Sequence, residues 1–350
     1  MIEIYSLERW ENWDQVVRSF DDHDIYWLSG YVRAFRLHGD GEPMLLYYED
    51  GDLRGINVVM KRDIAHDKHF VGKIPEGEYF DLATPYGYGG WLFEGEEKED
   101  SFDKFSEEYT SLCKDNKIVS EFVRFHPVLE NASFINDRYY DTVLLGPTVA
   151  IELDDKEKIW ERYSSKNRSH IRVAMKEGVS VKIDNSKEAF EQFMKIYETT
   201  MDHDDADSYY YFDRDFFESV RKDLEGSGTI FTAYLGDVAI ASSIMLYSEK
   251  YMNYHLSGQL FEYRRYSGTS VILDEAAKWG CDKGFRWLHL GGGLGAKEGP
   301  LYEFKKAFYK KGEDKKFHIG RKIFDEERYN ELLGMREGDL DEGFFPRYRA

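Results

Sequence analysis

The sequence TIFTAYLGDVAIASSIM, residues 229–245, decides the fold. It holds two apolar runs joined by Gly236-Asp237, which predicts a buried hairpin with a tight turn. Apolar residues at helical spacing predict two helices before the hairpin, over residues 190–201 and 216–224. After the hairpin the pattern predicts a strand (251–257), a helix (268–280), a strand (285–290), a short helix (301–308) and a strand near 315–319. This order predicts an α/β (α+β) lobe.

A second stretch, MLLYYEDGDLRGINVVM at residues 44–60, repeats the hairpin, with Gly51-Asp52 in the place of Gly236-Asp237. It too follows two predicted helices. The chain has 350 residues, which exceeds the size at which one hydrophobic core usually stops growing. The sequence Leu145-Gly146-Pro147 reads as a linker. We therefore expect a duplication, with a first lobe over residues 1–147 and a second lobe over residues 148–319.

Composition limits the classes of function. The formal net charge of -20 repels polyanions, which argues against a protein whose whole surface grips DNA. Apolar runs such as Ile240–Tyr247 are much shorter than the ~20 residues that cross a bilayer, and the N-terminal sequence does not have the pattern of a signal peptide. The two cysteines, Cys113 and Cys281, make no disulfide framework or metal-ligand spacing. We expect a cytoplasmic protein with no membrane, DNA or metal partner.

Two basic stretches, Lys156–Lys176 and Lys305–Lys322, interrupt the acidic background. They are either solvated surfaces or local sites for an anionic ligand. Within the first stretch, Arg168, Arg172 and Lys176 recur every four residues and form one stripe along a predicted helix. An arginine side chain can bind phosphate oxygens through two hydrogen bonds.

The predicted order of elements over residues 187–319 resembles that of the GNAT acyltransferase superfamily. Four strings together are similar to its Fem-like branch, which includes peptidoglycan-bridge aminoacyltransferases: FDLATPYGYGG (80–90), SSKNRSHIR (164–172), HLGGG (289–293) and FKKAF (304–308). The resemblance implies a tandem pair of GNAT lobes facing one cleft. Each would have a mixed, mostly antiparallel sheet flanked by helices, and residues 320–350 would return to complete the first lobe.

The GNAT resemblance also implies a donor site. In that superfamily a loop of the type R/Q-x-x-G-x-G/A opens a helix, and its backbone N–H groups hold the pyrophosphate of an acyl-CoA. The corresponding residues here are Arg265, Gly268, Thr269 and Ser270. Ser270 departs from the pattern, because glycine or alanine is expected there, and a side chain would stand where the backbone should approach phosphate.

The same resemblance implies roles for basic residues. One lysine of the FKKAF string, Lys305 or Lys306, would stabilise the negative charge that develops during acyl transfer. Arg168 and Arg172 would bind a diphosphate of the acceptor. Arg33 and Arg36, on a predicted helix in the first lobe, stand near the place where a relative uses a lysine for the same phosphates.

Four further residues are candidates for the cleft. Asp81 and Tyr86 flank the glycine-rich segment of the first lobe, and Asp81 could take a proton from the attacking amine. Tyr254 and His255 lie on the strand that pairs with the acyl donor in GNAT proteins. Since side chains alternate along a strand, we expect only one of these two to face the cleft.

We therefore predict an N-acyltransferase that moves an acyl or aminoacyl group from acyl-CoA or aminoacyl-tRNA to an amine. The acceptor would be a small molecule, phosphorylated or similar to a cell-wall precursor, and a tRNA acceptor stem would be the partner if the donor is aminoacyl-tRNA. The protein would be a monomer or a homodimer. The alternative is a catalytically degenerate GNAT pair that binds a ligand or a protein.

Overall fold

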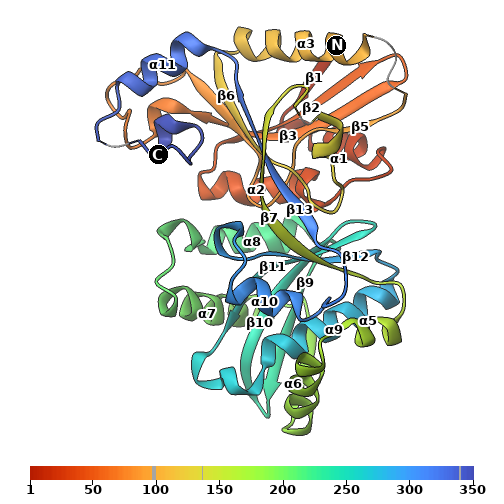
Figure 1. Ribbon diagram of the computed structural model, residues 1–350. Helices are drawn as coiled ribbons and strands as arrows, with labels where there is room; N and C mark the ends of the chain where they lie inside the picture. The colour runs from red at the N-terminus through yellow and green to blue at the C-terminus, as the bar shows by residue number, and fades with distance from the viewer. Residues whose placement is uncertain (97–99, 136, 339) are drawn as a thin grey trace. The chain divides into compact units, whose positions relative to one another are not determined.

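The computed structural model describes residues 1–96, 100–135, 137–338 and 340–350 and divides the chain into two compact units. Unit 1 comprises Met1–Leu145 and Phe317–Ala350, and unit 2 comprises Gly146–Lys316. Each unit has a mixed, mostly antiparallel sheet with helices against it (Figure 1). The predicted fold class is confirmed.

Unit 2 is built on six strands in the order β7-β12-β11-β10-β9-β8. All neighbours are antiparallel except β11 and β12, which are parallel. The predicted hairpin is β9 and β10, and its turn uses Gly236 at a φ of 59°, a left-handed conformation that favours glycine. The strands are β7 (Asp141–Glu152), β8 (Val179–Asp184), β9 (Gly228–Leu235), β10 (Val238–Tyr247), β11 (Tyr251–Gln259) and β12 (Trp287–Gly292).

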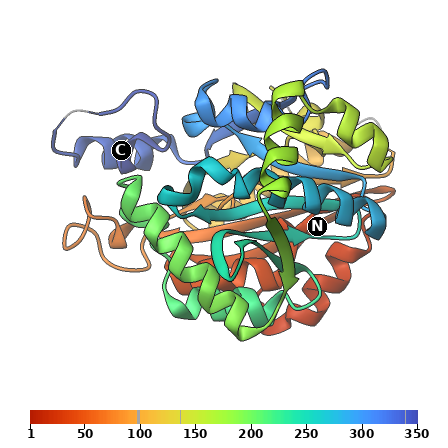
Figure 2. The ribbon, with the colours of Figure 1, turned by 90° about the horizontal axis from the view of Figure 1, so that it is seen from below.

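Helices cover both faces of this sheet, with α7 and α9 on opposite sides of β9–β11 (Figures 1 and 2). Side chains of α9 such as Val271 pack with Met245 and Met252 of the strands in one buried core. On the α7 side, Gly258 lies so close to the backbone of Ile196 that a Cβ atom would be 2.8 Å from its carbonyl oxygen. The helices are α5 (Lys156–Arg162), α6 (Ser165–Lys176), α7 (Lys187–His203), α8 (Arg214–Asp223), α9 (Gly268–Lys283) and α10 (Pro300–Lys306).

Unit 1 has the strand order β1-β2-β3-β4-β6-β13, with β5 paired to β3. Again one neighbouring pair, β4 and β6, is parallel and the others are antiparallel. The strands are β1 (Ile2–Tyr5), β2 (Glu42–Asp50), β3 (Leu53–Asp63), β4 (Phe80–Ala83), β5 (Leu92–Glu94), β6 (Ile118–Arg124) and β13 (Lys315–Ile323). The helices are α1 (Trp10–Arg18), α2 (Ser29–His38), α3 (Ser101–Asp115), α4 (Ala132–Ile135) and α11 (Glu326–Gly334).

The division between the two units falls at Leu145-Gly146-Pro147, where a linker was expected, but the expectation of an irregular linker is wrong because these residues lie within β7. Thr148 and Val149 of β7 pair with β12, and Gly146 passes so close to Ala296 that a Cβ atom would lie 1.9 Å from its carbonyl oxygen. Tertiary pairing therefore keeps the segment extended, although glycine and proline are poor strand formers.

Over the described ranges, the helices are too short or too polar for a membrane span.

Candidate active site

The parallel strands of unit 2 separate partway along their length. β11 and β12 pair at Tyr251–Trp287, Met252–Leu288 and Asn253–His289. Beyond these pairs β11 runs on beside β10 to Gln259, and β12 runs on beside β7 to Gly292. The carboxyl ends of two parallel strands thus diverge, which is where open α/β sheets place ligands.

Lys305 reaches the end of β12. It lies in the last turn of α10, is 9% exposed, and its Nζ donates a hydrogen bond of 2.7 Å to the carbonyl oxygen of Gly292. Burial lowers the pKa of Lys305 to about 8. The side chain remains mostly charged at pH 7 and sits beside one of the two diverging strand ends.

Lys306 points elsewhere. Its Nζ forms an ion pair of 2.7 Å with Asp314 and donates a second hydrogen bond of 2.7 Å to the carbonyl oxygen of Gly312. Both contacts hold Lys306 to the turn after α10, so the geometry favours Lys305 over Lys306 as the cation of the site.

The start of α9 lies beside the end of β11. Thr269 donates a hydrogen bond of 3.3 Å to the side chain of Gln259. Gly268 is buried against β10, where a Cβ atom would lie 3.1 Å from Ile240. No side chain within the described ranges caps this helix end. The predicted donor loop therefore stands at the second of the two diverging strand ends.

Two features limit this helix end as a phosphate site. The backbone N–H of Ser270, which is itself buried, donates to the carbonyl oxygen of Ser267 at 3.0 Å. Arg265 is exposed and lies over the ring of Tyr266, 4.7 Å from its centroid. The backbone N–H groups of Gly268 and Thr269, at the start of α9, are therefore the ones that could bind a phosphate without breaking a hydrogen bond to Ser267.

Tyr254 belongs to a group of hydroxyls between β10 and β11. Burial raises its pKa and the hydroxyls of Ser257 and Ser243 act in the opposite direction; the Ser243 hydroxyl donates a hydrogen bond of 2.9 Å to that of Ser257. The pairing register shifts at His255, so a bulge sets this residue apart from strict alternation. Burial lowers the pKa of His255 to about 3, so the imidazole is neutral at physiological pH.

Arg168 and Arg172 lie along α6, as predicted, but they have local partners. Arg168 donates to the carbonyl oxygens of Glu161 (3.0 Å) and Tyr163 (2.7 Å) and so caps the end of α5. Arg172 is exposed and stacks over Trp160 at 5.2 Å. Arg172 can reach an anion while it keeps its aromatic contact, whereas Arg168 would first have to release the end of α5.

Asp81 of unit 1 is fully buried and held by three side chains. It accepts hydrogen bonds from Arg62 (2.7 Å), Arg349 (2.6 Å) and the hydroxyl of Tyr348 (3.0 Å). Burial alone would raise its pKa, but the two arginines outweigh this effect and lower it. A carboxylate held charged in this way is a poor proton acceptor, so the geometry favours a structural role.

The other candidates of unit 1 lie on or against α2. Tyr86 stacks on Phe35 at 5.6 Å, and its carbonyl oxygen accepts a hydrogen bond of 2.6 Å from Tyr31. Arg36 forms an exposed ion pair of 2.8 Å with Glu42, and Arg33 is partly buried. The contacts of Tyr86 and Arg36 place them in local packing and surface pairing.

The parallel pair of unit 1 stays together where that of unit 2 opens. β4 and β6 pair from Phe80–Ile118 to Ala83–Phe122. The contact continues through Thr84, whose N–H donates to Phe122 at 3.1 Å, and through Gly89, whose N–H donates to Arg124 at 2.8 Å. The two units therefore share their pairing pattern and differ at the strand ends, which favours unit 2 for a donor site.

Two features of unit 2 were missed from the sequence. Asp274 of α9 is fully buried and forms an ion pair of 2.7 Å with Lys278, and a cavity lies between α7 and α8. The first could have been found as an acidic residue on the apolar face of a helix, but no sequence signal marks the second. Within the described ranges no three His, Cys, Asp or Glu side chains gather in a way that could hold a metal.

Comparisons with known proteins agree with this geometry. Residues 162–306 match the family model of the acetyltransferase (GNAT) domain, a range that includes α9 and Lys305. A search of curated proteins gives no match.

Solved structures share the fold at low sequence identity. FemX has a TM-score of 0.67 and 12% identity over 94% of this chain and 99% of its own. The C-terminal domain of a putative lysylphosphatidylglycerol synthetase from Agrobacterium fabrum has a TM-score of 0.56 and 13% identity over 90% and 91%. A tandem GNAT protein from the clavulanic acid biosynthesis pathway has a TM-score of 0.50 and 7% identity over 93% and 99%. Residues 162–306 therefore match the GNAT acetyltransferase domain, and the chain as a whole shares the fold of FemX and of the tandem GNAT protein.

Proposed function

We propose that unit 2 catalyses N-acyl transfer at the diverging ends of β11 and β12. The observation that carries the proposal is the position of Lys305, a buried cation whose Nζ lies 2.7 Å from the last carbonyl group of β12. The GNAT family match over residues 162–306 supports the same reaction class.

In this mechanism the acyl donor lies between the two strand ends, with its phosphates at the first amides of α9. A neutral amine attacks the donor carbonyl carbon, and the new C–N bond gives a tetrahedral intermediate with a negatively charged oxygen. Lys305 stabilises that oxygen. Collapse breaks the C–S bond of a thioester or the C–O bond of an aminoacyl ester, and the leaving group takes the proton that the amine loses.

The donor is acyl-CoA or aminoacyl-tRNA. The tandem GNAT protein is described as a structure without AcCoA, and the other structure is described as a domain of a putative lysylphosphatidylglycerol synthetase. The first description supports acyl-CoA as the donor, and the second supports an aminoacyl donor. In both cases the link to this chain is the shared fold alone. The acceptor is a small amine, phosphorylated or similar to a cell-wall precursor, with Arg172 as the arginine best placed to bind its phosphate. The cytoplasmic location and the monomeric or dimeric state stay predictions.

The test is a donor comparison with the purified chain. Acetyl-CoA and longer acyl-CoAs are mixed with a panel of amines and thiol release is followed, while aminoacyl-tRNA is followed through loss of its ester. One donor class should support amine-dependent turnover. Lys305→Met should lower kcat about 100-fold or more with little change in KM, as loss of an oxyanion donor does. Lys311→Met, an exposed lysine of the following loop, should leave kcat unchanged.

The dependence of kcat on pH tests the role of Lys305. A cation with a pKa of about 8 is lost as the pH rises through that value, so a kcat limited by Lys305 should fall above pH 8. If Lys305 instead removed the proton of the amine, kcat would rise through the same range. A rise that disappears in Lys305→Met would therefore contradict the electrostatic role.

A second function, ligand binding without transfer, is favoured by the contacts of the donor loop. The N–H of Ser270 is bonded within the helix and Arg265 lies over Tyr266. These contacts limit the binding of a donor's phosphates, so calorimetric titration that detects binding of another nucleotide-linked ligand or of a protein, with no amine-dependent turnover of acetyl-CoA or aminoacyl-tRNA, would support this alternative.

A further inference from the structure

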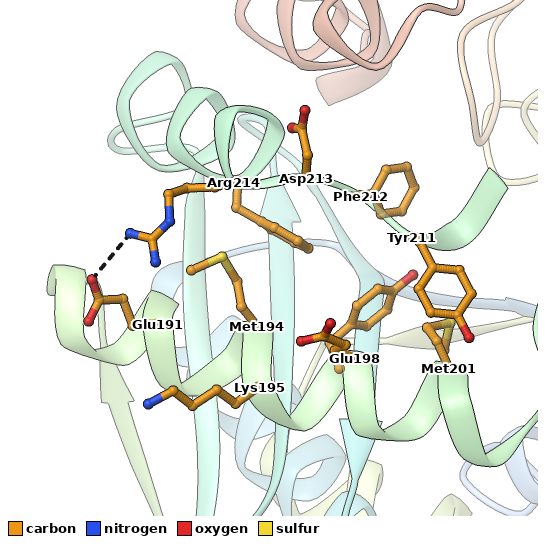
Figure 3. Close-up of a pocket in the computed structure, with 11 residues that line it drawn as sticks. Glu191, Met194, Lys195, Glu198, Met201, Tyr211, Phe212, Asp213 and Arg214 are labelled. Atoms are coloured by element: carbon orange, nitrogen blue, oxygen red, sulfur yellow. Dashed lines mark ion pairs between the residues drawn. The ribbon is translucent and has the colours of Figure 1, made fainter. Parts of the chain in front are cut away.

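A cavity of about 530 Å³ lies in unit 2 between α7 and the segment that leads into α8 (Figure 3). Its volume is in the range of sites for small organic ligands. The α7 residues that line it occupy the helix side that faces α8, whereas Phe190, Phe193 and Ile196 of the same helix are buried. The lining residues are Glu191, Met194, Lys195, Tyr197, Glu198, Met201, Tyr211, Phe212, Asp213, Arg214 and Phe217.

The floor of this α7–α8 cavity is apolar. Tyr197, Phe212 and Phe217 are each less than 10% exposed, and their rings contact one another with centroid distances of 6.0 to 6.2 Å. Met194 and Met201 lie apart along α7 and are partly buried (Figure 3). Methionine side chains are flexible and polarizable, so they adapt to apolar ligands of different shape.

The charges of the cavity are unequal at its two ends. At one end Arg214 forms an ion pair of 3.6 Å with Glu191 (Figure 3). Lys195 extends toward this same end and away from Tyr211. The positive groups of the lining are therefore gathered beside a carboxylate at one end.

The other end, around Tyr211, is acidic. The Tyr211 hydroxyl donates a hydrogen bond of 3.1 Å to Asp202. The pKa of Tyr211 is raised, mainly by partial desolvation and to a smaller extent by the carboxylates of Asp202, Asp205 and Glu198. Asp213 also lines the cavity, but its carboxylate accepts the N–H of Phe216 at 2.8 Å and caps α8. Glu198 and Asp213 both line the cavity and are exposed to solvent, but one oxygen of Asp213 is used to cap α8, so Glu198 is the better candidate to pair with a ligand.

We propose that the α7–α8 cavity binds a small amphipathic cation, with its amine beside Glu198 and Tyr211 and its apolar body on Met194, Met201 and Phe212. The apolar floor excludes ligands that are polar throughout, and the acidic end disfavours anions. This site is formed by α7 and α8 and not by the diverging ends of β11 and β12. The proposal therefore does not depend on acyl transfer.

Tryptamine and indole-3-propionate are matched probes, because both carry an indole ring on a short chain and they differ in the sign of their charge. The chain is labelled with ¹³C at the methionine methyl groups, and the probes are titrated while NMR spectra are recorded. The nine methionines include Met194 and Met201, which report on the cavity directly. Tryptamine should shift these two methyl signals in a saturable way, and indole-3-propionate should bind at least tenfold more weakly.

Two charge reversals on α7 test the acidic end. Glu198→Lys should weaken tryptamine binding about tenfold, while Glu188→Lys should leave it unchanged. Glu188 is exposed on the same helix outside the cavity, so both variants change the net charge equally and neither alters a buried residue. The proposal fails if tryptamine does not shift Met194 and Met201, if both probes bind equally, or if the two variants weaken binding to the same degree.

Discussion

A charged lysine inside a folded protein lowers the free energy of unfolding, and the pKa of Lys305 indicates the size of this effect. Burial lowers its pKa from 10.5 to about 8, which corresponds to about 3 kcal/mol of destabilisation when the amine is charged. The hydrogen bond to Gly292 recovers part of this free energy. A residue that weakens the fold in this way is typical of a functional site.

This reasoning predicts that Lys305→Met stabilises the protein at neutral pH. Below pH 8 the lysine is charged in the folded and the unfolded state, and the full destabilisation is present. Between pH 8 and 10.5 the folded state releases the proton first, so the destabilisation disappears as the pH rises. Urea unfolding should show a gain of roughly 1 to 3 kcal/mol for Lys305→Met at pH 7 and a smaller gain at pH 10. An equal gain at both values would mean that charge burial is not the cause.

Individual site residues could be predicted only where a motif fixes them. The FKKAF string predicts a cation, but neighbouring residues of a helix point about 100° apart, and the sequence could not tell which lysine faces the site. The ion pair of Lys306 with Asp314 favours Lys305 for that position. Arg168 binds backbone carbonyl groups at the end of α5. Asp81 binds Arg349, which is 268 residues away in the sequence. Such contacts carry no local sequence signal.

Elements were predictable where local rules suffice. The hairpin of β9 and β10 and the helix α9 are confirmed, because a Gly-Asp turn and an apolar period are properties of a short segment. The separation of β11 from β12 and the bulge at His255 were not predictable. They depend on which distant strand, β10 or β7, each residue pairs with.

Strand β6 carries a buried carboxylate whose charge should affect the stability of unit 1. Glu121 is fully buried and accepts hydrogen bonds from Tyr140 (2.7 Å) and Asn57 (3.1 Å), yet burial raises its pKa to about 7. Between pH 4.5 and 7 the folded state holds a proton that the unfolded state has lost. The carboxylate therefore destabilises unit 1 progressively as the pH rises through this range, and fully above pH 7.

We accordingly expect Glu121→Gln to raise the free energy of unfolding by roughly 1 to 3 kcal/mol at pH 8 and to have little effect at pH 4.5. Glutamine has a similar size and no charge to desolvate. Urea unfolding at both pH values provides the measurement, with Glu107→Gln on the exposed side of α3 as the control. A stabilisation that is the same at pH 4.5 and pH 8 would exclude the charge of Glu121 as its source.

At the scale of the whole chain, the two units share one pattern of strand pairing but differ in how many segments of the sequence form them. The orders are β1-β2-β3-β4-β6-β13 and β8-β9-β10-β11-β12-β7. In each order the fourth pair of neighbours, β4/β6 or β11/β12, is parallel and the other four pairs are antiparallel. Unit 2 is one continuous stretch, Gly146–Lys316, whereas unit 1 needs Phe317–Ala350 in addition to its first 145 residues.

The contacts of the returning segment show why unit 1 depends on it. β13 pairs with β6 from Ile319–Arg124 to Ile323–Ser120. Tyr348 is fully buried and hydrogen-bonded to Ser120 (2.8 Å), and Arg349 pairs with Asp81 at 2.6 Å. Without this segment β6 would lose a neighbour and the buried Asp81 would lose a charge partner, a loss that commonly costs about 3 to 5 kcal/mol.

The two units should therefore differ in their ability to fold alone. Residues 146–316 expressed as a separate chain should give near-ultraviolet circular dichroism and a cooperative thermal transition, because their sheet and their core lie within one stretch. Residues 1–145 alone should give neither. The same residues joined to 317–350 by a flexible linker of about ten residues should regain both, since β13, Tyr348 and Arg349 return to their places. Cooperative unfolding of residues 1–145 alone, at a midpoint equal to that of the joined chain, would show that the returning segment is dispensable.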